Sequence, residues 1–346
     1  MVVVHAALFR YHKSMNKRAL RADILLLITA GLWGFGFVAQ SSGMDFLGPF
    51  TYNALRFPLA LLSLLPLIFI LQAKGRLGGG KGAALSGGAR AACARTLLAG
   101  SVLFFAVMIQ QIGMIFTTVG NAGFITGFYV VLTPVFGIFI GKKTGLPTWV
   151  GMVFALAGLY FIFAANRLSS VNLGDVILLV GAVFWTFHIL VIDHLVQKLD
   201  PLILSAGQVA WCGLFSVIAA FTLEPVVTAW AARAGGDAAA AQRWVSLSDL
   251  LRPAGTFSFR ALSGAVIPVL YGGLASVGIA YTLQVVAQKD APPAHATILL
   301  CLEGVFAALG GILLRNEKPG PFTLLGFAFM LLAMFITQWD VIGRKS

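Results

Sequence analysis

Two charged residues lie inside apolar runs of this sequence, Arg56 within 49–70 and Glu303 within 295–314. A carboxylate in such a run must be protonated, paired with a cation or exposed to water in a cavity, because an apolar medium strongly disfavours an isolated charge. Glu303 is therefore a candidate proton carrier, ligand for an amine or structural partner. Arg56 is a candidate gating residue or anion ligand, and structural and gating roles are favoured because its long side chain can extend to the nearer interface.

Aromatic and amide side chains accompany these charges. Trp33, Phe37 and Gln40 are spaced to share one helix face, and Trp185 and His188 are spaced to share another. A cavity lined by aromatic rings and a few amides would suit a small amphipathic organic molecule, although packing is the commoner role of any single aromatic residue. The candidate substrate-binding residues are Trp33, Phe37, Gln40, Gln111, Trp185, His188, Tyr281 and Gln284.

Patterns that would indicate an enzyme are weak. HILVID, residues 188–193, places a histidine five residues before an aspartate, but on a continuous helix the two side chains diverge by about 140°. GFGFVA, residues 34–39, matches a dinucleotide fingerprint without the βαβ unit that would make it meaningful. The sequence has no Walker loop, zinc motif or nucleophile elbow. We therefore expect no catalytic residue, metal or cofactor, and an enzyme is the least favoured alternative.

The composition places these residues in a membrane. The chain of 346 residues is 59% hydrophobic and 10% charged, whereas soluble domains carry about 25% charged residues. Helices are expected because the hydrocarbon core, about 30 Å thick, offers no partners for unpaired backbone groups. The ten apolar runs are 23–42, 50–71, 97–117, 122–141, 147–165, 173–193, 202–223, 262–284, 295–314 and 321–339.

The positive charges predict the orientation. The net charge is +12, and Lys and Arg are concentrated in short connectors, a distribution that encodes topology and gives no reason to expect a nucleic-acid partner. With the N-terminus inside, the inner segments hold 16 Lys and Arg residues and the short outer loops hold three. We therefore predict cytoplasmic tails at 1–21 and 340–346, and an outer, solvent-facing loop at 224–261.

This topology can be tested by thiol labelling in a background without native cysteines. An impermeant reagent should modify Asp237→Cys in intact cells and spare Leu85→Cys, because residues 235–241 are expected outside and 83–92 in the cytoplasm. The reverse labelling pattern would contradict the predicted orientation.

The sequence also contains an internal repeat. At an offset of 152 residues, Asp23 falls on Asp175 and Trp33 falls on Trp185. Each copy holds five runs, and because five is odd, the second copy must enter the membrane from the opposite side. Inverted repeats are typical of secondary transporters, in which substrate binds near the midplane between the halves. The predicted fold class is an all-α membrane protein with ten transmembrane helices as two inverted five-helix repeats, 22–165 and 173–339.

Five segments, taken in order, carry a family resemblance. They are LLITAGLWGFGFVAQ, GPFTYNALRF, QQIGMIFTTVGNAGFITGFYVVLTPVFG, GLPTWVGMVFALAGLY and LEGVFAALGGILLRNEKPGPFTLLGFAFMLLAM. Over residues 22–339 the chain resembles the drug/metabolite transporter superfamily, EamA type. The resemblance implies a ten-helix carrier of small organic metabolites, and it places an arginine at Arg56 in the LRF motif. The chain departs from the family's Glu-Pro pairs, with Thr133-Pro134 in one half and Glu303-Gly304 in the other.

The leading hypothesis is a secondary active transporter of the plasma membrane, the bacterial inner membrane, that exports amino-acid-like or aromatic compounds by alternating access. Uptake or exchange of an anionic metabolite through Arg56 is the alternative within transport. The expected partners are a small-molecule substrate and the lipid bilayer, with protons as a candidate coupling ion and no nucleic acid. Glu303 and Arg56 are assigned to coupling or gating. The substrate, the direction and the oligomeric state stay open.

Overall fold

The computed structural model describes residues 17–75, 77, 88–117, 119–165, 173–234, 246–250, 259–315 and 320–343. The helices of the first half are α2 (Lys17–Met44), α3 (Pro49–Ala73), α4 (Gly88–Gly113), α5 (Val119–Thr126), α6 (Tyr129–Phe139) and α7 (Leu146–Ala165). The second half comprises α8 (Leu173–Leu195), α9 (Pro201–Thr222), α10 (Glu224–Arg233), α12 (Leu247–Leu250), α13 (Phe259–Leu270), the π-helix η1 (Tyr271–Tyr281), α14 (Thr282–Gln288), α15 (Pro293–Leu300), α16 (Glu303–Arg315) and α17 (Pro321–Gly343). Within the described residues the regular elements are therefore helices, as predicted; positions 85 and 237, chosen for labelling, lie outside those residues.

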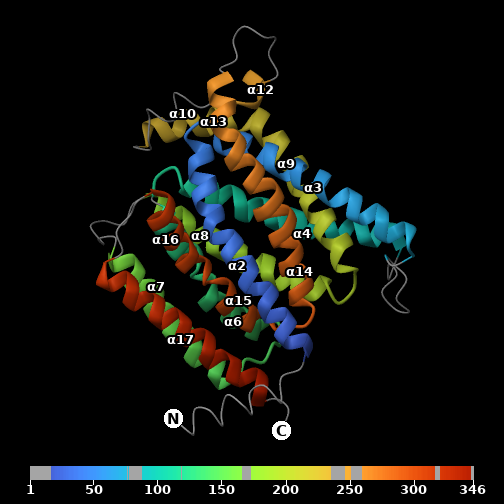
Figure 1. The fold of residues 1–346 in the computed structure, drawn as a ribbon. Helices are drawn as coiled ribbons and strands as arrows, with labels where there is room; N and C mark the ends of the chain where they lie inside the picture. Colours follow the sequence, from blue (N-terminus) through green and yellow to red (C-terminus); the bar gives the residue numbers. More distant parts are fainter. Residues whose placement is uncertain are drawn as a thin grey trace.

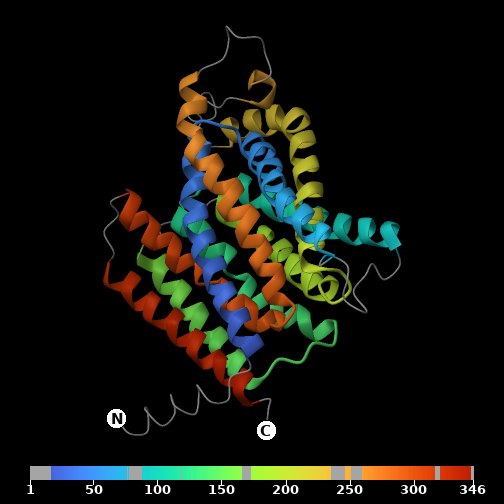
Figure 2. The same ribbon diagram turned by 45° about the vertical axis from the view of Figure 1, so that its right-hand side comes forward.

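Eight of the described helical runs are long and apolar enough to cross a membrane. They are Lys17–Met44, Pro49–Ala73, Gly88–Gly113, Ala122–Phe139, Leu173–Leu195, Pro201–Thr222, Ser263–Gln288 and Pro293–Leu314. The remaining two predicted runs correspond to shorter apolar helices, Leu146–Phe161 and Leu324–Thr337. These belong to α7 and α17, which pack side by side along one flank of the bundle (Figures 1 and 2). The multi-pass membrane character is confirmed, and the count of ten spans stays a prediction.

Prolines begin the second helix of each half. Pro49 is the first residue of α3 and Pro201 is the first residue of α9, a position that suits proline because its missing N–H would have no intrahelical partner there. At α9 the Asp200 carboxylate also accepts hydrogen bonds from the backbone N–H groups of Leu202 (2.9 Å) and Ile203 (3.4 Å). Local sequence signals therefore determine where these helices start.

The first helices of the two halves run in opposite directions. Met44 at the end of α2 and Met114 just after α4 share a buried cluster with Leu178 near the start of α8. At its other end, α8 contributes Ile192 to a second buried cluster that also contains Ala99, which lies in the first half of α4. Helix α8 is therefore antiparallel to α2 and α4, as expected of a second half that enters the membrane from the opposite side.

Two of the predicted runs are interrupted about a third of the way along. Residues 127–128 separate α5 from α6, and residues 301–302 separate α15 from α16. The two interrupted runs cross at glycines, since a Cβ atom on Gly123 would lie 3.6 Å from the Cα atom of Gly304. Hydropathy stays high through both runs, so the sequence pattern does not reveal the breaks. Backbone hydrogen bonds continue through both breaks, for example from Gly127 N–H to Gly123 O at 3.1 Å and from Cys301 N–H to Thr297 O at 2.9 Å, so each break is a local change of helical winding.

The connection after α9, predicted as a solvent-facing outer loop at 224–261, has many exposed residues in its described part and is anchored by a few buried ones. Glu224 is 2% exposed, and its Oε2 atom accepts hydrogen bonds from the Thr51 backbone N–H (2.7 Å) and from Thr51 Oγ1 (2.8 Å). Gly48 allows this approach, because a Cβ atom there would overlap the Glu224 carboxylate. Leu247 then donates its backbone N–H to Thr51 Oγ1 at 2.8 Å. A buried carboxylate with well-placed donors explains why the described part of this loop docks on the start of α3.

The predicted run at 262–284 is continuous but irregular. It is formed by α13, η1 and α14, and η1 has π-helical hydrogen bonding over 11 residues. π-Helical turns are frequent at functional sites, because the wider turn changes which side chains face inward. Ser276 and Tyr281 of η1 are both buried in the interior of the bundle.

Candidate functional site

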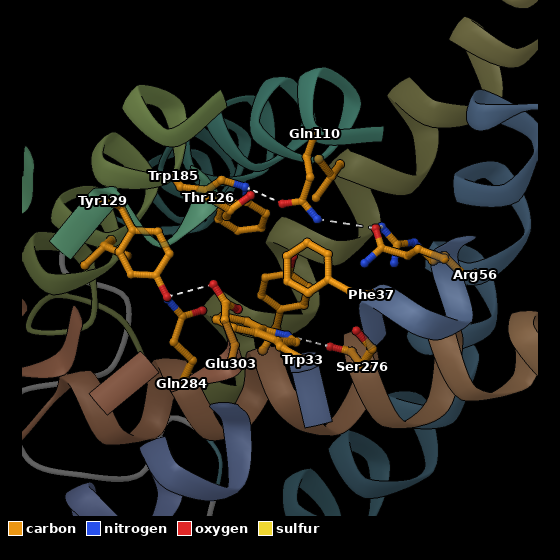
Figure 3. Close-up of a pocket in the computed structure, with 14 residues that line it drawn as sticks. Trp33, Phe37, Arg56, Gln110, Thr126, Tyr129, Trp185, Ser276, Gln284 and Glu303 are labelled. Atoms are coloured by element: carbon orange, nitrogen blue, oxygen red, sulfur yellow. Dashed lines mark hydrogen bonds between the residues drawn. The ribbon is translucent and has the colours of Figure 1, made fainter. Parts of the chain in front are cut away.

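A cavity lies between the two halves, close to the breaks in the interrupted helices (Figure 3). It contains about 450 Å³ of empty space, including the part that is open to solvent, of which only about 20 Å³ can hold the centre of a water molecule, so the cavity is narrow in this conformation. Both halves contribute to its wall. The lining residues are Trp33, Phe37, Gln40, Arg56, Val107, Gln110, Thr126, Tyr129, Trp185, Ile189, Ser276, Tyr281, Gln284 and Glu303.

Eight of the ten residues predicted for the site line this cavity: Trp33, Phe37, Gln40, Arg56, Trp185, Tyr281, Gln284 and Glu303. Gln111 and His188 do not. Successive residues of a helix are about 100° apart, so the cavity face of α4 carries Gln110 while Gln111 is buried on another side. Substrate contact by the eight lining residues stays a prediction.

His188 supports the cavity wall from behind. Its Nε2 atom lies 2.8 Å from Gln208 Oε1, and its ring meets Trp185 edge-on with the ring centroids 5.8 Å apart. Asp193 instead forms an ion pair with Lys142. The two residues of HILVID therefore have separate partners and do not form a catalytic pair.

Three aromatic rings from the two halves form one wall. The ring centroids of Trp33 and Tyr281 are 4.9 Å apart, those of Trp33 and Trp185 are 6.0 Å apart, and those of Trp185 and Tyr281 are 6.2 Å apart. Each tryptophan is held by a hydrogen bond to the other half: Trp33 Nε1 donates to Ser276 O at 3.0 Å, and Trp185 Nε1 donates to Gln110 Oε1 at 2.7 Å (Figure 3). Buried indoles normally find such an acceptor, and here the acceptors fix the orientation of the rings.

Arg56 provides the positive side of the cavity. It is 2% exposed; its Nε atom donates to Asn53 Oδ1 at 2.7 Å and its Nη2 atom donates to Gln40 Oε1 at 3.3 Å. Gln110 Nε2 donates to the same Gln40 oxygen at 3.5 Å. The guanidinium also lies 5.1 Å from the centroid of the Tyr52 ring, within the range of a cation–π contact. These contacts orient the cation toward the cavity.

Glu303 provides the negative side. It is 3% exposed, begins α16, and accepts a hydrogen bond from Tyr129 Oη at 2.9 Å (Figure 3). Two further oxygens of the lining, Gln284 Oε1 and Thr126 Oγ1, have no hydrogen-bond partner within the part of the chain that the structure describes. Arg56 makes its hydrogen bonds with Asn53 and Gln40, so it does not neutralise Glu303 by direct contact. This side therefore offers oxygen acceptors to whatever occupies the cavity.

Six lining residues were not predicted: Val107, Gln110, Thr126, Tyr129, Ile189 and Ser276. Thr126 and Tyr129 flank the break between α5 and α6, which hydropathy does not reveal. Gln110 could have been found by considering both adjacent glutamines. Among the residues that the structure describes, no group of three or more His, Cys, Asp or Glu side chains could hold a metal ion.

The chain matches known transporters over most of its length. The EamA-like transporter family matches residues 20–164 and 172–339. An uncharacterized transporter of Archaeoglobus fulgidus is 26% identical over 325 residues, covering 94% of this chain and 88% of the relative. A second uncharacterized transporter of that organism is 22% identical over 321 residues, covering 92% of this chain and 97% of the relative.

A solved crystal structure is also similar, with a TM-score of 0.67 at 15% sequence identity, and covers 94% of this chain and 99% of that chain. At this identity the likeness concerns the fold alone. The family match occurs once in each half and follows the sequence repeat, which confirms the resemblance identified from the motifs. The protein therefore belongs to the EamA-like transporter family, within the drug/metabolite transporter superfamily.

Proposed function

We propose that the protein is a secondary active transporter that exports zwitterionic, amino-acid-like compounds, aromatic ones above all, across the plasma membrane. The observation that carries the proposal is the cavity between the halves, which has a buried cation on one side, a buried carboxylate on another and an aromatic wall. A zwitterion would supply each buried charge with an opposite charge. This matters because a buried ion without a partner is strongly unfavourable.

The polar groups suggest how such a substrate would be oriented. Its carboxylate would lie near Arg56 and the Gln110 amide, which are donors. Its ammonium would lie near Glu303 and the oxygens of Gln284 and Thr126, which are acceptors without a partner among the described residues. The Trp33–Trp185–Tyr281 wall would contact the apolar part of the substrate by ring stacking.

The proposal includes ten spans, with α7 and α17 as the fifth and tenth. These helices have 20 and 23 residues, which at 1.5 Å per residue is about 30 and 35 Å, enough for a hydrocarbon core. The antiparallel course of α2 and α8 supports an inverted arrangement of the repeats, and the distribution of Lys and Arg supports cytoplasmic termini. Alternating access would then move one half against the other around the cavity.

One observation favours a second candidate, the uptake or exchange of an anionic metabolite. The contacts of Arg56 are with an amide, a second amide and aromatic rings, so its charge has no carboxylate partner among the described residues. An anion without an amine would neutralise it and leave Glu303 protonated. The two candidates differ in whether the substrate must carry a positive group.

A set of three matched ligands distinguishes them: an aromatic amino acid, its N-acetyl derivative and the corresponding decarboxylated amine. We expect the zwitterion to be transported in proteoliposomes and to stabilise the purified protein against heat. Each charge-deficient analogue should bind about ten- to a hundredfold more weakly, since a hydrogen bond to a charged group contributes about 1.5–3 kcal/mol. Preference for the N-acetyl acid would favour the anion carrier. Mass spectrometry must recover the substrate unchanged, because chemical conversion would indicate an enzyme.

A further inference from the structure

Aspartates at the same position of the two repeats bond across to the opposite half. Asp23 of α2 lies with its Oδ1 atom 2.7 Å from His295 Nε2, in α15 of the second half. Asp175 of α8 accepts a hydrogen bond from Thr117 Oγ1 at 2.8 Å, and Thr117 belongs to the first half. Asp23 and Asp175 are 6% and 7% exposed. Both contacts therefore join the halves through a buried carboxylate.

The two contacts also hold corresponding parts of the fold. His295 is the third residue of α15, and Thr117 lies two residues before α5. Each aspartate thus joins the first helix of its own half to the beginning of the interrupted run of the other half. The interrupted runs also provide Tyr129 and Glu303, which line the cavity and bond to each other across the halves.

The contacts lie on opposite sides of the cavity. Each aspartate precedes the cavity tryptophan of its helix by ten residues, Asp23 before Trp33 and Asp175 before Trp185, a separation of about 15 Å along the helix axis. Because α8 runs antiparallel to α2, the two aspartates are displaced from the rings in opposite directions. One cross-repeat contact therefore stands on each side of the substrate cavity.

A second carboxylate reinforces each side. On the side of Asp23, Asp193 near the end of α8 pairs with Lys142, which follows α6 of the first half. On the side of Asp175, Glu224 accepts both hydrogen bonds from Thr51. Asp23 and Asp193 contact basic side chains, His295 and Lys142, whereas Asp175 and Glu224 accept hydrogen bonds from the threonines Thr117 and Thr51. The contacts on the two sides are therefore related by the repeat but use different kinds of partner.

We propose that Asp23–His295 and Asp175–Thr117 are the closing contacts of two gates, one on each side of the cavity, and that the transport cycle breaks them alternately. The proposal rests on the alternating-access mechanism proposed above. An opening between α2 and α15, or between α8 and the start of α5, requires the corresponding contact to separate. Removing one contact should therefore shift the population toward the conformation that is open on its own side, because only the closed state loses a stabilising interaction.

The test measures access to the cavity from each side. The reporter is Ser276→Cys, in a background in which Cys93, Cys212 and Cys301 are replaced, because Ser276 lines the cavity. An impermeant thiol reagent is applied to sealed right-side-out and inside-out vesicles. Asp23→Ala should raise the labelling rate about tenfold from the side of Asp23, the cytoplasmic side in our topology, and Asp175→Ala should do so from the opposite side. A tenfold shift corresponds to about 1.4 kcal/mol, which is within the contribution of a hydrogen bond to a charged group.

Two further variants provide a second test of the outer contact and a control. Thr117→Val keeps the side-chain shape, removes the outer donor and should reproduce Asp175→Ala. Asp200→Asn is the matched control, since the hydrogen bonds of the Asp200 carboxylate to described residues stay within its own half, at the start of α9; it should leave both labelling rates unchanged. Should Asp23→Ala and Asp175→Ala change both sides equally, or should folded Thr117→Val change neither, the assignment of the gates is wrong.

The labelling assay needs no substrate, so it is independent of the proposed substrate class. If the gate variants change labelling as expected but the protein transports no zwitterion, the gate assignment stands and the proposed substrate class is wrong. If the protein transports zwitterions but the variants cause no side-specific change in labelling, the proposed function stands and the gate assignment is wrong.

Discussion

Replacing Glu303 by Gln should abolish accumulation of substrate driven by a pH gradient, while transport down the gradient of the substrate itself continues at saturating substrate, with weaker binding because the amide no longer pairs with the substrate ammonium. Glu303 is the carboxylate that lines the cavity, and it is almost completely buried. The substitution keeps the shape of the side chain and its acceptor oxygen toward Tyr129, but an amide cannot exchange a proton near neutral pH. A carrier that couples proton release to substrate binding at this site would therefore lose its driving force. Efflux of labelled substrate from proteoliposomes, with and without a pH gradient, measures the effect.

The same variant separates the three roles considered for Glu303. Loss of pH-driven accumulation with binding retained indicates a proton carrier, and loss of binding itself indicates a ligand for the substrate amine. Loss of stability, rescued by removing the Arg56 charge as well, would indicate a structural ion pair, although the hydrogen bonds of Arg56 go to Asn53 and Gln40. Tyr129→Phe is the matched control for the hydrogen bond, since it leaves the carboxylate able to exchange a proton and should preserve accumulation. Unchanged rate, pH dependence and stability in Glu303→Gln would exclude Glu303 from the site.

Replacing Gly34 by Ala should prevent correct packing of the two halves. A Cβ atom on Gly34 would lie 2.7 Å from the carbonyl oxygen of Glu303 and 2.8 Å from the backbone nitrogen of Ala307. Both are backbone atoms, so α2 and α16 would have to move apart, and the first residue of α16 is Glu303 itself. Overpacking of this kind destabilises a core by about 1–3 kcal/mol. We expect a loss of about 3 kcal/mol here, because the neighbouring backbone atoms cannot move aside as a flexible side chain can. We expect a lower midpoint of thermal unfolding and loss of transport together.

Gly31, three residues before Gly34 on the same face of α2, provides a control substitution. A Cβ atom on Gly31 would meet only the ring of Phe306, at 3.9 Å, which is an ordinary contact. Gly31→Ala should therefore have nearly native stability and transport, and it tests whether removal of a helical glycine alone has an effect. Equal stability of Gly34→Ala and Gly31→Ala would contradict the close packing of α2 on α16.

The membrane class and the repeat could be predicted from the sequence because they depend on periodic, additive properties. The mean hydropathy of a run depends on all of its residues, so a single polar residue does not change the prediction of a membrane span. The repeat is visible in paired residues such as Asp23 with Asp175 and Trp33 with Trp185, since two copies of one unit keep the same register. Both tryptophans were predicted for the site because of the polar residues on the same helix faces, Gln40 for Trp33 and His188 for Trp185. Buried charge was an equally direct signal, because Arg56 and Glu303 could persist in apolar runs only with partners or a cavity.

Only the tertiary structure decided how these residues meet. Gln110 rather than Gln111 faces the cavity because the rotation of α4 is set by its packing partners, and two adjacent amides are equivalent in sequence. Tyr129 reaches the site just after a change of helical winding at residues 127–128, which the continuous apolar sequence does not reveal because the backbone stays hydrogen-bonded there. The partners of Asp23 and Asp175 are likewise invisible in the chain, since His295 and Thr117 are distant in sequence and reach them only after the two halves assemble. Composition and repeat thus determined the class of protein, and packing between the halves determined the cavity and the contacts on either side of it.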